Sequence, residues 1–134
     1  MRILIDTNIL LAIATKRSSE RWLYEMLRTN ELTLILSNEI IEEYEEKLSW
    51  FYSSYFAEIV LDELLNLPQT EQIEAFYKWH LIEEDPDDNK FVDIAIASNA
   101  DYIITNDKHF KVLRNIPFPK VQILSLQEFK DLSF

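Results

Sequence analysis

The chain has 134 residues, a hydrophobic fraction of 48% and a net charge of −11, and it contains neither cysteine nor glycine. This length and composition predict one domain, spanning residues 1–134, and the missing cysteine and glycine exclude disulfides, thiolate metal sites and glycine-rich phosphate-binding loops. The negative charge argues against broad nonspecific binding of nucleic acid through a basic face, but it leaves open a nucleic-acid substrate held locally by metal ions.

Short apolar runs along the chain predict buried parallel strands, because strands covered on both faces are apolar throughout. These runs cover residues 2–5, 32–36, 101–105 and 121–124. Amphipathic stretches between them predict helices over about 8–14, 18–29, 38–48, 52–65, 88–98 and 127–131. The alternation predicts a parallel α/β sheet with helices on both faces.

Several polar residues are expected to begin or end these helices. Ser37 suits the N-cap of the helix at 38–48, and Ser18-Ser19-Glu20 suits the start of the helix before it. Without glycine, the turns and helix C-caps that glycine usually serves are expected to be formed by asparagine, aspartate and serine, with Asn30, Asn66 and Asn99 as candidates. Residues 75–79 fit either a helix or a strand.

Acidic residues follow two of the predicted strands at their carboxyl ends. Asp6 comes after residues 2–5, and Asp107 comes after residues 101–105. Ligands of open parallel sheets bind in the crevice beyond the carboxyl ends of the strands. A concentration of acids there is unfavourable unless a cation neutralises it, so the pattern indicates a site for a hard cation.

Two more acids are candidates for the same site. Glu43 lies on the helix after the second strand, and Asp88 opens the helix before the third. Oxygen ligands suit Mg²⁺ or Mn²⁺, which polarise a phosphodiester and lower the pKa of a bound water. No Ser-His-Asp triad and no cysteine–histidine metal set competes with this interpretation, since the chain has two histidines and no cysteine.

Four motifs in the sequence resemble those of PIN-domain ribonucleases. They are Ile5-Asp6-Thr7-Asn8, Ser37-Asn38-Glu39-Ile40-Ile41-Glu42-Glu43, Asp85-Pro86-Asp87-Asp88-Asn89-Lys90-Phe91, and Ala100-Asp101-Tyr102-Ile103-Ile104-Thr105-Asn106-Asp107-Lys108-His109-Phe110. The third has the form found in PIN toxins of one bacterial subgroup, within the VapC-like toxins. Together the motifs cover most of the chain in the order of the family. Asn106 departs mildly from the glycine or arginine that the family often shows nearby.

The resemblance implies a three-layer α/β/α fold with a central parallel sheet of about four to five strands. It also implies a Mg²⁺- or Mn²⁺-dependent endoribonuclease that hydrolyses RNA, often the toxin of a toxin–antitoxin pair. The expected partners are then an RNA substrate, an antitoxin protein and a second copy of the chain in a homodimer.

The resemblance also assigns roles to particular residues. Asp6, Glu43, Asp88 and Asp107 would be the catalytic, metal-binding acids, and Asn8 and Thr105 would orient carboxylates or bound water. Two of these assignments stay open at this point. Glu42 competes with Glu43, and Asp87 and Asp93 compete with Asp88.

Ordinary roles are possible for each of these residues. Asp6 and Asp107 could be helix N-caps, Glu43 could be a solvated helix acid, and some of the acids at 85–88 could only form a turn. Both histidines, His80 and His109, are expected to be satisfied polar residues rather than ligands.

Other features leave the function open. Lys90 and Lys108 could contact RNA phosphate or be plain surface charges. The aromatic stretch at 50–52, with Tyr55 and Phe56, is expected to lie in the core or on a dimer or partner surface, with stacking on nucleic-acid bases as the less favoured alternative. A non-catalytic binding module for a partner protein or RNA, and a metal-dependent phosphohydrolase or DNA nuclease, remain alternatives.

No apolar run approaches the roughly 18 to 20 residues of a membrane span, and Asp6 interrupts the apolar start of the chain, which argues against a secretory signal. With the absence of cysteine, this pattern fits a cytoplasmic protein that is not attached to a membrane.

Overall fold

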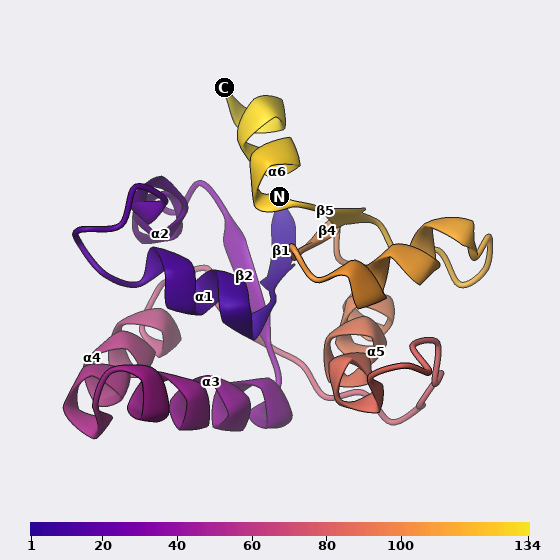
Figure 1. Ribbon diagram of the computed structural model, residues 1–134, viewed down its shortest axis with the longest axis horizontal. Helices are drawn as coiled ribbons and strands as arrows, with labels where there is room; N and C mark the ends of the chain where they lie inside the picture. Colours follow the sequence, from indigo (N-terminus) through magenta and orange to yellow (C-terminus); the bar gives the residue numbers. More distant parts are fainter.

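The computed structural model describes residues 1–134 and shows a five-stranded parallel sheet between layers of helices (Figure 1). The strands are β1 (Arg2–Ile5), β2 (Thr33–Leu36), β3 (Glu71–Gln72), β4 (Tyr102–Ile104) and β5 (Ile123–Leu124). Their order in the sheet is β3-β2-β1-β4-β5, and every neighbouring pair is parallel. The predicted α/β class and three-layer arrangement are confirmed.

Six α-helices and two 3-10 helices cover the sheet. They are α1 (Thr7–Ile13), α2 (Arg21–Arg28), α3 (Asn38–Phe51), α4 (Ser54–Leu65), η1 (Pro86–Asp88), α5 (Asn89–Ser98), η2 (Lys108–Asn115) and α6 (Leu126–Ser133). In Figure 1, α1 to α4 lie on one side of the strands and α5 on the other, while α6 stands at the end that carries both termini. No helix is long and apolar enough to cross a membrane.

The central strand β1 places Asp6 in the middle of the sheet's carboxyl edge. Ile3 lies opposite Leu34 of β2 on one side and Tyr102 of β4 on the other. A single cluster of 35 buried hydrophobic residues includes residues of β1, β2, β4 and the helices on both faces. The apolar residues of β1, β2 and β4 suit strands that are covered by helices on both faces.

The connection between β3 and α5 differs from the expectation. Residues 75–79 form neither a helix nor a strand, and the short strand β3 was not predicted because its two residues are polar. Side chains of α5 bind the extended chain instead: Asn89 accepts from Ile82 N and donates to Ile82 O, both at 2.9 Å. Asp93 Oδ1 accepts from Trp79 N at 3.1 Å.

The predicted helix ends are partly right. Ser37 caps α3 by accepting from Ile40 N at 3.2 Å. Asn30 and Asn99 have φ values of 63° and 53°, as expected of residues that replace glycine. Asn66 is the C-cap of α4, as expected, but its φ of −100° is not left-handed. Ser18 is not the N-cap of α2: its hydroxyl accepts from Glu20 N at 3.0 Å and closes the turn before the helix.

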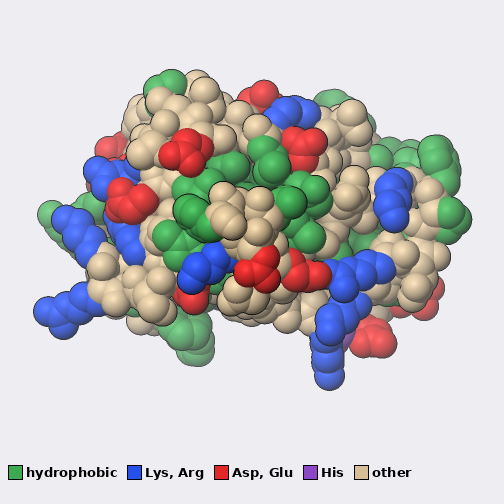
Figure 2. Space-filling model, turned by 90° about the horizontal axis from the view of Figure 1, so that it is seen from above, with side chains coloured by type: hydrophobic (Ala, Val, Ile, Leu, Met, Phe, Trp, Pro, Cys, Tyr) green, Lys and Arg blue, Asp and Glu red, His purple; other side chains and the backbone are tan.

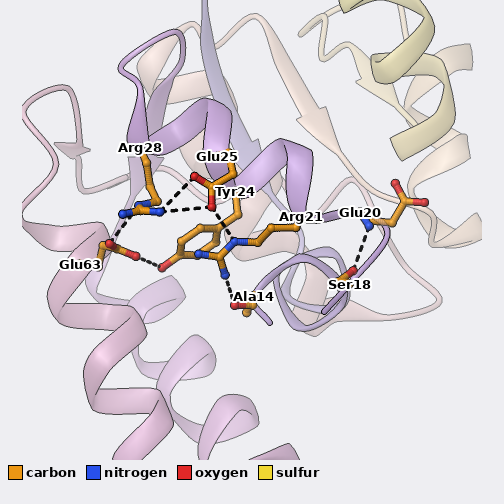
Figure 3. A network of polar contacts seen from close by, with 8 residues as sticks. All are labelled: Ala14, Ser18, Glu20, Arg21, Tyr24, Glu25, Arg28 and Glu63. Carbon is orange, nitrogen blue, oxygen red and sulfur yellow. Dashed lines mark hydrogen bonds and ion pairs between the residues drawn. The ribbon is translucent and has the colours of Figure 1, made fainter. Parts of the chain in front are cut away.

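A polar network joins α2 to α4 (Figure 3). Tyr24 donates its hydroxyl hydrogen to Glu63 Oε1 at 2.6 Å, and Arg28 Nε lies 3.2 Å from Glu63 Oε2. Arg21 lies over the ring of Tyr24, at 4.0 Å from its centroid. Burial, and then the Glu63 carboxylate, raise the pKa of Tyr24, so its hydroxyl stays protonated and serves as a donor.

The aromatic stretch at the end of α3 is largely on the surface. Trp50, Phe51 and Tyr55 are 80%, 60% and 66% exposed, so an assignment of these three to the core is wrong. Tyr52 donates to Leu11 O at 2.7 Å, and Phe56 packs against the core. The exposed rings leave a dimer or partner surface as the favoured interpretation and base stacking as the other.

The surface carries no broad basic area on the face seen in Figure 2. Hydrophobic side chains gather over the middle of that face, with acidic side chains among them, and lysine and arginine lie mostly toward its two sides. This distribution agrees with the net charge of −11. It does not favour nonspecific nucleic-acid binding through that face.

Candidate metal centre

Asp6 lies directly after β1, at the N-cap position of α1, but its side chain makes no capping hydrogen bond. The residue is only 5% exposed, and its Oδ2 accepts from Thr105 Oγ1 at 2.9 Å. A plain N-cap role for Asp6 is therefore wrong. The carboxylate is instead held by the Thr105 hydroxyl at the end of β4.

Thr105 connects Asp6 to Asp107. Its Oγ1 also accepts from Asp107 N at 3.0 Å, so one buried hydroxyl orients both the side chain of Asp6 and the backbone of Asp107. Asp107 Oδ1 accepts from His109 N at 2.9 Å and caps η2. The ordinary capping role of Asp107 is thus present, and it fixes the direction of the carboxylate.

Asp88 is the last residue of η1 and precedes α5. Its Oδ2 is buried and has no hydrogen-bond partner. Burial, and then the charges of Asp85, Asp6, Asp107 and Glu43, raise the pKa of Asp88 to about 7. A buried carboxylate oxygen without a donor is unfavourable when ionised, and a bound cation would compensate it.

The four sequence-predicted acids lie close enough to influence one another. Burial raises the pKa of Asp6 to about 6, and the charges of Asp107 and Glu43 add to this effect although the Thr105 hydroxyl opposes it. Because Asp88 is affected by the other three acids as well, β1, α3, η1 and β4 deliver their carboxylates to one region. This region is the carboxyl edge of the sheet.

The tightest group of potential ligands overlaps this set only in part. Ligand atoms of Asp85, Asp88, Asp107 and His109 all lie within 4.8 Å of one another, and this group leaves out Asp6 and Glu43. Asp85 and His109 were expected to be turn or satisfied polar residues. In the sequence, only their positions could have indicated this role: Asp85 comes shortly before Asp88, and His109 shortly after Asp107.

His109 departs from the expectation of a satisfied polar residue. Its Nδ1 is buried without a hydrogen-bond partner, at 3.5 Å from Asp107 Oδ1 and 3.9 Å from Asp85 Oδ2. Its Nε2 lies 3.3 Å from Glu84 Oε2.

Glu43 has partners for both carboxylate oxygens. Its Oε2 accepts from the Thr7 hydroxyl, and its Oε1 lies 2.7 Å from Lys90 Nζ. The Glu43 side chain is 15% exposed, so the expectation of a solvated helix acid is wrong. Glu42, the competing residue, is exposed.

The other competing residues have different surroundings. Asp93 accepts a hydrogen bond from Trp79 N and so holds the segment before η1 against α5. Asp87 is exposed and lies 3.1 Å from Lys90 Nζ. Asn8 is exposed, and its side chain makes no hydrogen bond to any of the four acids.

Two kinds of basic residue border the acids. Lys90 is held inside by Glu43 and Asp87, whereas Lys108 is exposed. Asp107 also lines a surface hollow together with Lys111 and Arg114. Basic residues beside an acidic centre are suited to contact phosphate groups.

The residues present fit a divalent cation. Asp88 supplies a buried oxygen without a partner, and burial and then neighbouring carboxylates raise the pKa values of Asp6 and Asp88 to about 6 and about 7. Carboxylate oxygens are the ligands preferred by Mg²⁺ and Mn²⁺. An imidazole such as that of His109 suits the second ion better than the first.

The sequence matches a known protein family. The family model described as PIN domain matches residues 2–109. The chain belongs to the PIN domain family. No curated protein matches the chain in sequence.

Solved structures share the fold of this PIN domain. VapBC2 from Rickettsia felis, bound to a DNA fragment from its promoter, has a TM-score of 0.65 and 24% identity over 93% of this chain and 98% of that chain. VapBC-1 from nontypeable Haemophilus influenzae has a TM-score of 0.59 and 14% identity over 95% and 99% of the two chains.

A third similar structure is the Mycobacterium tuberculosis toxin VapC20, described as cleaving the sarcin–ricin loop. It has a TM-score of 0.56 and 14% identity over 81% of this chain and 92% of that chain. At these identities the likeness shows the shared PIN fold.

Proposed function

We propose that this PIN domain is a metal-dependent endoribonuclease and the toxin of a toxin–antitoxin pair. The observation that carries the proposal is the buried, partnerless Oδ2 of Asp88, which lies among acids brought from β1, α3 and β4. An acidic centre of this kind is the arrangement expected for a metal nuclease. The family membership and the VapC neighbours support the same activity.

In this proposal Asp6, Asp88 and Asp107 hold the metal, with Glu43 as the fourth predicted acid. A bound Mg²⁺ or Mn²⁺ polarises a phosphodiester and lowers the pKa of water. Thr105 keeps the Asp6 carboxylate and the Asp107 backbone in place through its two hydrogen bonds. The carboxylates would orient the metal ion and neutralise its charge, and none of them acts as a nucleophile.

The RNA substrate is proposed to approach along the side that carries η2. Lys108 and Lys111 are exposed on this helix, and Lys111 lines the same hollow as Asp107. These ammonium groups would attract the phosphate backbone locally, although the chain as a whole is acidic. Phosphate contacts of this kind position a strand and do not read its sequence.

We also propose two protein partners, an antitoxin and a second copy of the chain. Solved complexes named VapBC share the fold, which supports an antitoxin. The exposed rings of Trp50, Phe51 and Tyr55 supply an aromatic surface, and aromatic residues are enriched in protein interfaces. This surface suits the homodimer.

The test is Mn²⁺-dependent cleavage of a mixed RNA pool by the wild type and Asp6→Asn. Asp62→Asn, an exposed acid on α4, is the matched control. The proposal expects cleavage that disappears with EDTA and falls by more than about a hundredfold in Asp6→Asn, because the metal contributes several kcal/mol to the transition state. Equal cleavage by Asp6→Asn and Asp62→Asn would refute it. A folded wild type that neither cleaves RNA nor binds Mn²⁺ would support the non-catalytic binding module.

A further inference from the structure

Lys90 brings its ammonium group against two acids of the acidic centre. Its Nζ lies 2.7 Å from Glu43 Oε1 and 3.1 Å from Asp87 Oδ1. The side chains of Lys90 and Glu43 are 14% and 15% exposed, so this pair is largely shielded from solvent. Charges shielded in this way interact more strongly than charges on an open surface.

The pair changes what Glu43 can offer to a metal. One of its oxygens accepts from Thr7, and the other is held by the ammonium group. Asp88, in contrast, has a buried oxygen with no donor at all. A divalent ion that entered this region would find Asp88 open and Glu43 already neutralised.

We propose that Lys90 is a built-in competitor of the divalent metal, a positioning residue that holds Glu43 and weakens the affinity of the acidic centre for the ion. This inference rests on the proposed function, since it concerns the same site. The ammonium group acts in two ways: it occupies a carboxylate that the ion would otherwise use, and its positive charge repels the ion.

The position of Lys90 also has a consequence for the metal-free protein. Five acids of this region, Asp6, Glu43, Asp85, Asp88 and Asp107, would otherwise repel one another without an internal counter-charge. Lys90 neutralises one of them without any ion. The domain can therefore remain folded at low metal concentration, at the expense of tight metal binding.

The experiment measures Mn²⁺ affinity by calorimetry for the wild type, Lys90→Met, Lys90→Arg and Lys120→Met. Lys90→Met keeps most of the side-chain length and removes the charge, and Lys120→Met is the matched control because Lys120 is exposed and comes before β5, whereas the acids follow the carboxyl ends of the strands. We expect Lys90→Met to bind Mn²⁺ about tenfold more tightly or more, from the loss of a nearby positive charge. Lys120→Met should change the Kd by less than about threefold, and Lys90→Arg should stay near the wild type.

Thermal unfolding provides a second measurement that separates competition from general loss of structure. Lys90→Met should unfold at a lower temperature than the wild type in EDTA, because Glu43 loses its counter-charge. Mn²⁺ should then raise its Tm by more than it raises that of the wild type, since tighter binding stabilises the folded state more. A merely structural role would lower the Tm equally with and without Mn²⁺.

The outcomes distinguish this inference from the proposed function. An unchanged or weaker Mn²⁺ affinity in Lys90→Met, with Mn²⁺ bound by the wild type, would overturn the inference and leave the nuclease proposal standing. If the wild type bound no Mn²⁺ and cleaved no RNA, the proposed function would fail, and the inference would fail with it.

Discussion

Thr105 donates its hydroxyl hydrogen to Asp6 Oδ2 over 2.9 Å, a bond between residues that directly follow the neighbouring strands β4 and β1. The Thr105 hydroxyl oxygen in turn accepts from Asp107 N. Both Asp6 and Thr105 are buried, so neither partner has water as a ready substitute. Because this bond joins residues at the ends of two paired strands, the pairing of β1 with β4 fixes the spacing between Asp6 and Asp107.

Replacement of Thr105 by valine should disturb the acidic centre while it keeps the shape of the side chain. The variant leaves the Asp6 carboxylate without its donor and Asp107 N without its acceptor. We expect Mn²⁺ affinity or cleavage to fall about 10- to 100-fold, the usual effect of losing a group that orients metal ligands. Thr105→Ser, which keeps the hydroxyl, is the control. Equal losses in the two variants would indicate that packing of the methyl group matters and the hydrogen bond does not.

Replacement of Asp88 by asparagine should stabilise the metal-free protein at neutral pH. Unfolded aspartate titrates at about 3.9, whereas burial and neighbouring acids raise the pKa of folded Asp88 to about 7 and that of Asp6 to about 6. The folded state therefore binds more protons than the unfolded state across this interval. Stability is greatest below the unfolded pKa and is lost as the pH rises through the folded values.

The measurement is the Tm in EDTA between pH 4 and pH 8. The wild type should lose stability as the pH rises through about 6 to 7, and Asp88→Asn should lose less, because its side chain does not ionise. Asp62→Asn should follow the wild type. A wild-type Tm that rises across this interval to the same extent as that of Asp88→Asn would show that Asp88 is not held in an unfavourable ionised form.

The bond between Tyr24 and Glu63 should support the fold without affecting the metal centre (Figure 3). Tyr24→Phe removes one hydrogen bond to a charged acceptor between α2 and α4. We expect unfolding to become easier by about 1.5 to 3 kcal/mol. Urea titration measures the loss, and RNA cleavage at a temperature where both proteins are folded should be unchanged. A loss of cleavage in folded Tyr24→Phe would mean that this network is coupled to the site.

The aromatic surface around Trp50 should determine the oligomeric state. A charge placed among exposed rings at an interface core is unfavourable, so Trp50→Glu or Tyr55→Glu should shift the protein from dimer toward monomer. Sedimentation velocity over a range of concentrations measures this shift. Phe118→Glu is the control, because Phe118 is 82% exposed and lies between η2 and β5. If only Phe118→Glu dissociated the dimer, the interface would lie at the loop between η2 and β5 instead.

The strands and the site could be read from the sequence to different degrees. β1 and β4 are apolar runs that end in Asp6 and Asp107, and a parallel sheet brings its carboxyl ends to one edge, so this pair could be placed from local pattern and topology. β3 could not, because its two residues are polar and pair with β2 only through the backbone. The predicted strand at 121–124 is real but shorter, since only Ile123 and Leu124 pair with β4.

The remaining features depend on contacts between distant parts of the chain. The conformation of residues 75–79 could not be predicted from local sequence, because side chains of a later helix hold this extended segment. Asp93 binds Trp79 N, and Asn89 binds Ile82 N just beyond it. The pairing of Glu43 with Lys90 joins α3 to α5, and sequence spacing alone could not distinguish it from a solvated acid. Asp85 and His109 meet at the site through two separate 3-10 segments.

The metal centre can be tested directly by a crystal structure of the protein soaked in Mn²⁺, with the ion located by anomalous scattering. We expect a peak at the carboxyl edge of the sheet, bound by Asp88 together with Asp6 or Asp107, and no peak in crystals of Asp88→Asn. A folded wild type with no Mn²⁺ at this edge, or with an ion only at acids elsewhere on the surface, would contradict the claim that these residues form a metal centre.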